Sequence, residues 1–169
     1  LETGNAYNII GDFYYYKNDF NQAAKFYNQA LSAYQDTGYN EGIATEYHNL
    51  GIINYFLGDY HQSIDYSRKA YEIRKGLDDK RLTTNSLFNI ALIYKKWGNY
   101  DDAIRIYQEA KQVYEACDDK IGIANVLTNI ANVYRNTSGY EKATENYVAA
   151  LEIYEEIGDE DGRGNVLSN

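Results

Sequence analysis

Asparagine recurs at a fixed interval in this sequence, and its carboxamide is suited to recognising a peptide backbone. One set, spaced by 40 residues, comprises Asn49, Asn89, Asn129 and Asn169. A second set lies four residues earlier in each interval and comprises Asn5, Asn85, Asn125 and Asn165, with Thr45 in register. A carboxamide accepts and donates hydrogen bonds, so it can bond the C=O and the N–H of one peptide unit. Because residues four apart share a helix face, paired amides could hold an extended ligand, each bond adding about 0.5–1.5 kcal/mol.

The other chemically active residues form no catalytic or metal-binding pattern. His48 and His61 are expected on different helices, and Cys117 is expected to close a helix as a partly buried thiol. The acidic segment 158–164 lacks the spacing of a phosphate or calcium loop and is interpreted as a helix start. The sequence therefore predicts no catalytic residue, no metal site and no cofactor, and we do not expect the chain to be an enzyme by itself.

A repeat of 40 residues organises the chain without gaps. Small residues mark it most clearly, in the columns Gly11, Gly51, Ala91, Ala131 and Ala30, Ala70, Ala110, Ala150. Such self-similarity is typical of an array of stacked supersecondary units. We expect one array over residues 1–169, with units at about 1–40, 41–80, 81–120 and 121–160 and the start of a fifth at 161–169.

Each unit has the pattern of a helical hairpin. In the second unit Tyr47, Leu50 and Gly51 follow helical spacing, which predicts helix A near 41–57 and helix B near 60–76. Between them Gly58 suits the left-handed end of a helix and Asp59 the start of the next. The same positions in the other units hold Asn18-Asp19, Gly98-Asn99 and Ser138-Gly139, with Asn99 also expected to cap. Asp78-Asp79 is expected to mark the turn to the next unit.

Composition limits the classes of partner. The net charge of −9 speaks against a nucleic-acid or anionic-membrane partner, and no apolar run is long enough to span a bilayer. A single cysteine excludes an internal disulfide framework, and we expect a cytoplasmic location. Most of the 20 tyrosines, Tyr140 among them, recur in repeat columns and are expected to fill space between helices. Methionine is absent even at position 1, so we expect a segment of a longer chain.

The repeated columns resemble the tetratricopeptide repeat. The third unit matches its pattern as Leu87-x2-Ile90-Ala91-x2-Tyr94, followed by Ala103-x3-Tyr107-x2-Ala110. The period of 40 exceeds the usual 34 of the family, and the proline near the end of helix B is missing. Both departures resemble the long repeats of Pins/LGN-type adaptors, kinesin light chains and Rap-type receptors. The resemblance implies an all-α fold, a right-handed α-solenoid of stacked antiparallel helical hairpins.

The resemblance also implies a concave groove lined by the A helices, which would bind a protein or an extended peptide. The first two units would contribute an aromatic end and the last two a basic end, suited to a ligand with an apolar and an anionic part. The peptide-binding residues implied are Asn49, Asn85, Asn89, Asn125, Asn129, Asn132, His48, Tyr15, Tyr16, Tyr55, Lys95, Lys96 and Arg135.

Alternatives remain open at the level of sequence. The asparagines could instead hold neighbouring helices together, in which case replacing Asn89 and Asn129 with alanine would lower stability as well as binding. Lys95 and Lys96 could form a solvated patch at the end of a helix. The whole chain could be a structural or regulatory module of a larger signalling protein. Head-to-tail self-association through Val166 and Leu167 in the final helix is a third option.

Overall fold

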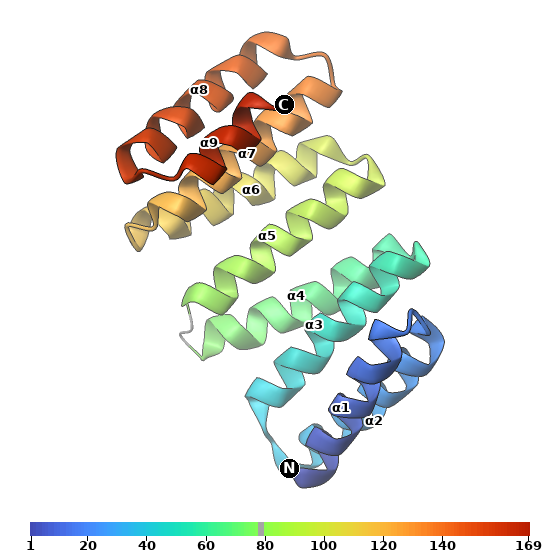
Figure 1. The fold of residues 1–169 in the computed structure, drawn as a ribbon. Coiled ribbons are helices and arrows are strands. Elements are labelled where there is room, and N and C mark those ends of the chain that lie inside the picture. The colour runs from blue at the N-terminus through green and yellow to red at the C-terminus, as the bar shows by residue number, and fades with distance from the viewer. Residues whose placement is uncertain (78–79) are drawn as a thin grey trace. The chain divides into compact units, whose positions relative to one another are not determined.

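All regular structure in the described residues, 1–77 and 80–169, is helical in the computed structural model (Figure 1). The predicted turn at Asp78-Asp79 lies outside the described residues. In the second unit the expected helices A and B are confirmed as α3 (Asn40–Leu57) and α4 (Tyr60–Gly76). The other helices are α1 (Glu2–Tyr16), α2 (Phe20–Thr37), α5 (Lys80–Trp97), α6 (Tyr100–Ala116), α7 (Lys120–Asn136), α8 (Tyr140–Ile157) and α9 (Glu160–Leu167).

Left-handed residues separate the helices at the repeat interval. One column holds Asn18, Gly58, Gly98 and Ser138, with φ values of 59°, 81°, 86° and 61°. Asp19 and Asp59 then cap the next helix, each accepting a bond of 3.1 Å from the backbone N–H three residues on. The expected cap at Asn99 is wrong in detail, because its Nδ2 donates to the Asp102 carboxylate at 2.7 Å and no side-chain cap forms.

The chain divides into two compact units, residues 1–93 and 94–169, each with its own core. In the first unit α1 packs along α2 and α3 along α4, around Ala23, Tyr27, Leu31, Leu50 and Ile53 (Figure 1). In the second unit α7 packs along α8, with a core of Ala124, Leu127, Ala150, Tyr154 and Val166. In both units the helices bury apolar side chains against one another, as expected of hairpins that stabilise one another by stacking.

A tyrosine near the end of helix B lies against a glycine in the first turn of the next helix. The pairs are Tyr34 with Gly42, Tyr114 with Gly122 and Tyr154 with Gly162, which occupy the same two positions of the 40-residue repeat in three hairpins. A Cβ on Gly122 would lie 2.3 Å from Cδ1 of Tyr114, which is closer than real side chains come. Glycine is therefore required there to admit the ring. In the second hairpin the corresponding residues are Arg74 and Leu82.

Two expectations about exposure are wrong. Tyr140 does not fill space between helices, since it begins α8 and is 66% exposed. Cys117 is exposed rather than partly buried, because it lies just beyond α6 as its C-cap.

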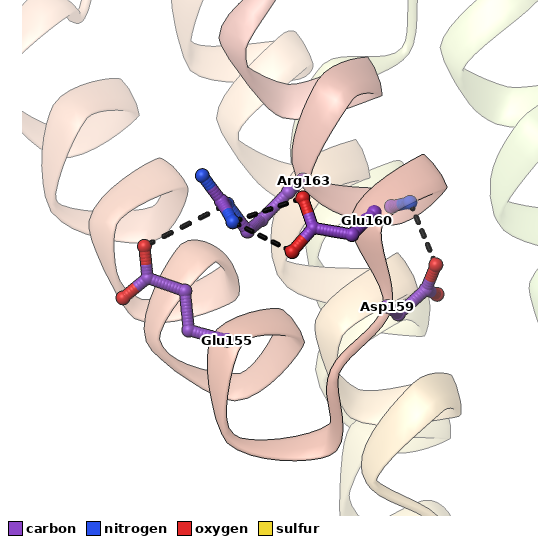
Figure 2. Close-up of polar contacts among 5 residues, drawn as sticks. Glu155, Asp159, Glu160 and Arg163 are labelled. Carbon is purple, nitrogen blue, oxygen red and sulfur yellow. Dashed lines mark hydrogen bonds and ion pairs between the residues drawn. The ribbon is translucent and has the colours of Figure 1, made fainter.

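The acidic segment 158–164 is confirmed as a helix start. Asp159 caps α9 by accepting a bond of 2.9 Å from the backbone N–H of Gly162. Figure 2 shows Arg163 between two carboxylates, with Glu160 at 2.8 Å and Glu155 at 3.7 Å. Val166, expected to serve self-association, is 5% exposed and packs in the core of its own unit, so that part of the expectation is wrong, while Leu167 is 67% exposed.

Candidate functional site

A hollow of about 220 Å³ in the first unit brings four of the predicted site residues together. Tyr15 comes from α1, His48 and Tyr55 from α3, and Asn89 from α5. The remaining wall is largely apolar and consists of Gly51, Ile52, Phe56, Ser67, Leu92 and Ile93. The repeat register places these four residues on the predicted binding face, but it does not predict that they share a hollow.

Aromatic rings form one side of this hollow. Phe56 stacks on Phe20 with ring centroids 5.0 Å apart and lies 6.0 Å from the ring of Tyr15. Tyr55 meets Phe56 edge to face at 5.5 Å. Such contacts hold the rings in place and add to the stability gained from their burial. The wall is therefore preformed, and it still leaves Phe56 half exposed to a ligand.

His48 contributes a neutral polar group to the hollow. Burial, assisted by the positive charge of Arg74, lowers its pKa to about 4. The imidazole is consequently uncharged at neutral pH and offers one donor and one acceptor. Together with the aromatic rings, this suits an uncharged apolar or aromatic side chain of a ligand.

Gly51 explains how α4 comes close to this part of α3. A Cβ on Gly51 would lie 2.7 Å from Ser67 Oγ and 3.3 Å from the backbone oxygen of Ser63. Ser63 also donates a buried hydrogen bond of 2.7 Å to the Gly51 carbonyl. The small-residue column thus has the packing role that the sequence predicts.

A second hollow of about 180 Å³ lies against the same helices. Tyr15 borders both hollows, and Tyr16 and Asn49 join it here, together with Asp12, Tyr27 and Ile52. Tyr16 is 81% exposed, so its ring is available to a ligand. Asn49 donates a long bond of 3.5 Å to Glu46. The first unit therefore gathers six of the thirteen predicted site residues around two hollows.

In the second unit the predicted cations differ in environment. Lys95 donates a bond of 2.9 Å to Asn129 Oδ1, and burial lowers its pKa below the usual range. Lys95 is therefore not part of a solvated patch, whereas Lys96 is exposed. Arg135 donates to the backbone oxygen of Asn169.

Two of the predicted site asparagines in the second unit, Asn125 and Asn132, brace helix B against helix A. The hydroxyl of Tyr154 donates to Asn125 Oδ1 at 3.0 Å, and that of Tyr147 to Asn132 Oδ1 at 2.7 Å. The same two columns in the first unit pair Tyr34 with Asn5 at 2.6 Å and Tyr27 with Asp12 at 2.8 Å. These contacts support a packing role for the column of Asn125. By contrast, neither Asn85 nor Asn89 has a side-chain hydrogen bond to any part of the chain that the structure describes.

The Tyr154–Asn125 bond predicts a measurable coupling. Replacing Tyr154 with phenylalanine, or Asn125 with alanine, should each lower the free energy of unfolding by about 1 kcal/mol, because each removes the same part-buried hydrogen bond. A double-mutant cycle by urea unfolding should give a coupling energy near that value. Additive losses would show that the two side chains stabilise the unit independently.

Sequence reasoning missed Glu46 and Arg74, two charged side chains that are almost completely buried, at 0% and 6% exposure. A signal was present in the repeat columns. Glu46 shares its column with Ala6, Ser86 and Val126, and Arg74 replaces a tyrosine found in the other three units. A charged residue in an otherwise neutral column is the mark that could have identified them.

Across the residues with described positions, no helix is both long and apolar enough to cross a bilayer. The same residues contain no group of three or more His, Cys, Asp or Glu side chains placed to share a metal ion.

Antiparallel helical hairpins that repeat every 40 residues define an α-helical repeat protein of the solenoid class. The chain belongs to the tetratricopeptide repeat family, whose models match residues 4–37, 42–116 and 123–157. Proteins of this family are typically non-catalytic, and the chain is a repeat scaffold of the protein-interaction type.

Solved structures confirm the fold. The aspartyl phosphate phosphatase F of Bacillus subtilis is 20% identical, with a TM-score of 0.85 over 98% of this chain and 43% of its own. A signal-transduction ATPase of Pyrococcus horikoshii with a tetratricopeptide repeat sensor is 20% identical, with a TM-score of 0.87 over 96% of this chain and 25% of its own. A Rap protein in complex with the Competence and Sporulation Factor is 14% identical, with a TM-score of 0.79 over 98% of this chain and 46% of its own.

The chain thus spans less than half the length of each of these three proteins. No curated protein matches it significantly by sequence.

Proposed function

We propose that this chain binds an extended peptide segment of a partner protein along its A helices. The observation that carries the proposal is the hollow formed by Tyr15, His48, Tyr55 and Asn89. It combines a preformed aromatic wall with uncharged polar groups, the usual composition of a site for an apolar anchor side chain. A Rap protein of the same fold has been solved with the Competence and Sporulation Factor, a precedent for ligand binding by such a fold.

Asn89 is the amide best placed to read the peptide backbone. It borders the hollow, and it has no side-chain partner in the described part of the chain, so its carboxamide does not have to give up a bond to receive a ligand. Asn129 differs, because its Oδ1 already accepts from Lys95 and, at 3.4 Å, from Tyr107. The asparagine ladder that we propose therefore depends most on Asn89 and Asn49 in the first unit. Asn85, four residues before Asn89 on the same helix, also belongs to it.

The second unit extends the proposal to the charge of the ligand. Lys96 is exposed there, and Lys95 is held by an amide oxygen rather than by a carboxylate. A cation whose partner is neutral still attracts an anion. We propose that these lysines and Arg135 favour an acidic side chain or a terminal carboxylate in the partner. A cytoplasmic location and head-to-tail association through Leu167 stay predictions.

Replacing Asn89 with alanine should weaken peptide binding about tenfold, the cost of roughly one good hydrogen bond. Peptides would be selected from a random display library against the purified chain and then measured as synthetic, dye-labelled peptides by fluorescence anisotropy. The selected peptides should share an apolar or aromatic anchor side chain, and Tyr55→Ala should weaken their binding as well.

Asn21 is the matched control, because it is an exposed asparagine on α2, a B helix. Asn21→Ala should bind the selected peptides with unchanged affinity. The melting temperature of Asn89→Ala should stay close to that of the original chain. Selection of no peptide above background, or equal binding by both variants, would overturn the proposal.

A further inference from the structure

A separate hollow of about 470 Å³ in the first unit is lined by charged side chains that the proposed peptide site does not use. Its walls come from α1, α3, α4, the start of α5 and the residues around the α2–α3 turn. The polar residues of its lining include Asn5, Asn8, Thr45, Glu46 and Arg74. None of its lining residues borders the hollow around Tyr15 and Asn89.

This hollow lies where the second hairpin departs from the repeat. In the first and fourth hairpins a tyrosine hydroxyl bonds the asparagine of helix A, and the ring lies on a glycine. In the second hairpin the three corresponding residues are Arg74, Thr45 and Leu82, and all three line the hollow. The Arg74 side chain instead donates to Ser86 Oγ at 2.8 Å. The tyrosine brace is therefore absent from the second hairpin, which carries a buried carboxylate beside this position.

That carboxylate belongs to Glu46, whose side chain is 0% exposed. Its Oε1 accepts a bond of 2.7 Å from Asn8, and its Oε2 accepts the long bond from Asn49. Glu46 forms no ion pair with any residue whose position is described. A buried carboxylate with only neutral donors is poorly stabilised, and a cation beside it would improve its environment most.

The other titratable groups around Glu46 keep the local potential negative. Asp12 on α1 accepts from Tyr27 of α2, and its charge raises the pKa of Glu46 further. Glu41 lies at the exposed rim on α3 and accepts from Tyr39. Burial raises the pKa of Tyr34 of α2 above its usual value, so this side chain is neutral at physiological pH. Among the described residues of the lining, Arg74 of α4 is the single cation, and it donates to Ser86 on α5 and helps to lower the pKa of His48.

We propose that this hollow binds an organic cation, a guanidinium or ammonium group, whose charge is balanced by the buried carboxylate of Glu46 behind the surface of the hollow. Asn5, Asn8 and Thr45 supply neutral acceptors for its N–H groups. The described linings of this hollow and of the proposed peptide site share no residue, although Asn49 of the peptide site donates its long bond to Glu46. An arginine or lysine side chain of a protein and a small free amine present the same chemistry, and both fit a hollow of this volume.

The probe is N-acetyl-L-arginine amide, with N-acetyl-L-citrulline amide as its uncharged isostere. Binding to the isotope-labelled chain would be followed by NMR titration. We expect the arginine probe to bind at least about tenfold more tightly than the citrulline probe at pH 8. Because Glu46 titrates near pH 7, the affinity should rise about tenfold between pH 6 and pH 8. Agmatine distinguishes the two sources of the cation. An affinity equal to that of the arginine probe indicates a small free cation, and a weaker affinity indicates a peptide side chain.

Glu46→Gln should remove the preference for the charged probe and the pH dependence together. The matched control is Glu72→Gln, an exposed carboxylate on α4 that does not line the hollow, which should change the affinity less than about twofold. Thr45→Phe fills the mouth without altering charge, and it should abolish binding while the chain stays folded. The proposal is overturned if citrulline binds as well as arginine, if Glu46→Gln retains the preference, or if an anionic probe, N-acetyl-L-glutamate amide, binds in its place through Arg74.

Discussion

Replacing Glu46 with glutamine is expected to stabilise the chain, and the gain should grow by about 2 kcal/mol between pH 5.5 and pH 8. Burial raises the pKa of Glu46 from 4.5 to about 7, although the bonds from Asn8 and Asn49 oppose the shift. The difference corresponds to about 3 kcal/mol that the charged form costs the folded state. Glutamine keeps an acceptor for Asn8 and carries no charge, so it avoids this cost.

The sign follows from the two pKa values. Since Glu46 binds its proton more tightly in the folded chain, its favourable contribution is complete below pH 4.5 and is lost as the pH rises through 7. His48 behaves in the opposite way, because burial lowers its pKa from 6.5 to about 4 and the unfolded chain then binds more protons. Its contribution makes stability rise from pH 4 to pH 6.5. The free energy of unfolding of the original chain should therefore depend only weakly on pH, because the contributions of Glu46 and His48 oppose each other.

Urea unfolding followed by circular dichroism at several pH values separates the two groups. Glu46→Gln should leave the rising dependence of His48, about 1 kcal/mol over the same interval. His48→Gln should leave the falling dependence of Glu46. The free energy of unfolding of Glu41→Gln, a substitution at an exposed position of the same helix, should change with pH as that of the original chain does. If the free energy of unfolding of Glu46→Gln also changed with pH as that of the original chain does, burial would not alter the titration of Glu46, and the burial argument would be wrong.

Replacing Gly122 with alanine should destabilise the second unit by about 2 kcal/mol, although alanine is the better helix former. The added Cβ would lie 2.3, 2.5 and 2.6 Å from three ring atoms of Tyr114, including Cγ next to the backbone. The ring cannot escape by moving only its tip, so it must leave its packed position. The loss would be measured as a fall in the midpoint of urea unfolding.

Two companion variants make this test specific. Gly164 is also helical, but a Cβ there would meet nothing within 4 Å, so Gly164→Ala should leave stability unchanged or slightly raised. Gly122→Ala combined with Tyr114→Leu should lose much less than the sum of the two single variants. A neutral or stabilising Gly122→Ala would show that the tyrosine–glycine contact does not constrain the hairpin junction.

The helices themselves were predictable because they depend on local properties of the chain. Residues such as Gly58 and Asp59 end one helix and begin the next through their own backbone and capping preferences, and the observed φ of 81° and cap bond of 3.1 Å agree. Asn99 was predicted less well. A neighbouring carboxylate, Asp102, competes for its side chain, and propensity does not record such competition.

The candidate site was predictable in part. The repeat register placed Tyr15, His48, Tyr55 and Asn89 on the A helices, and three of these helices do line one hollow with them. The roles of the asparagines could not be read from spacing, because Asn89 and Asn125 belong to helices of the same pattern. Only the neighbouring helix decides that Asn125 accepts from Tyr154.

The sequence by itself determined the period, the hairpins and the family, since all three follow from residue types repeated at one interval. The tertiary structure alone decided which side chains are desolvated and which donors meet which acceptors. Glu46 is an ordinary helical glutamate in sequence, yet its burial in the folded chain removes it from water and raises its pKa. Burial and pairing depend on atoms that are distant in the chain, and no local pattern specifies them.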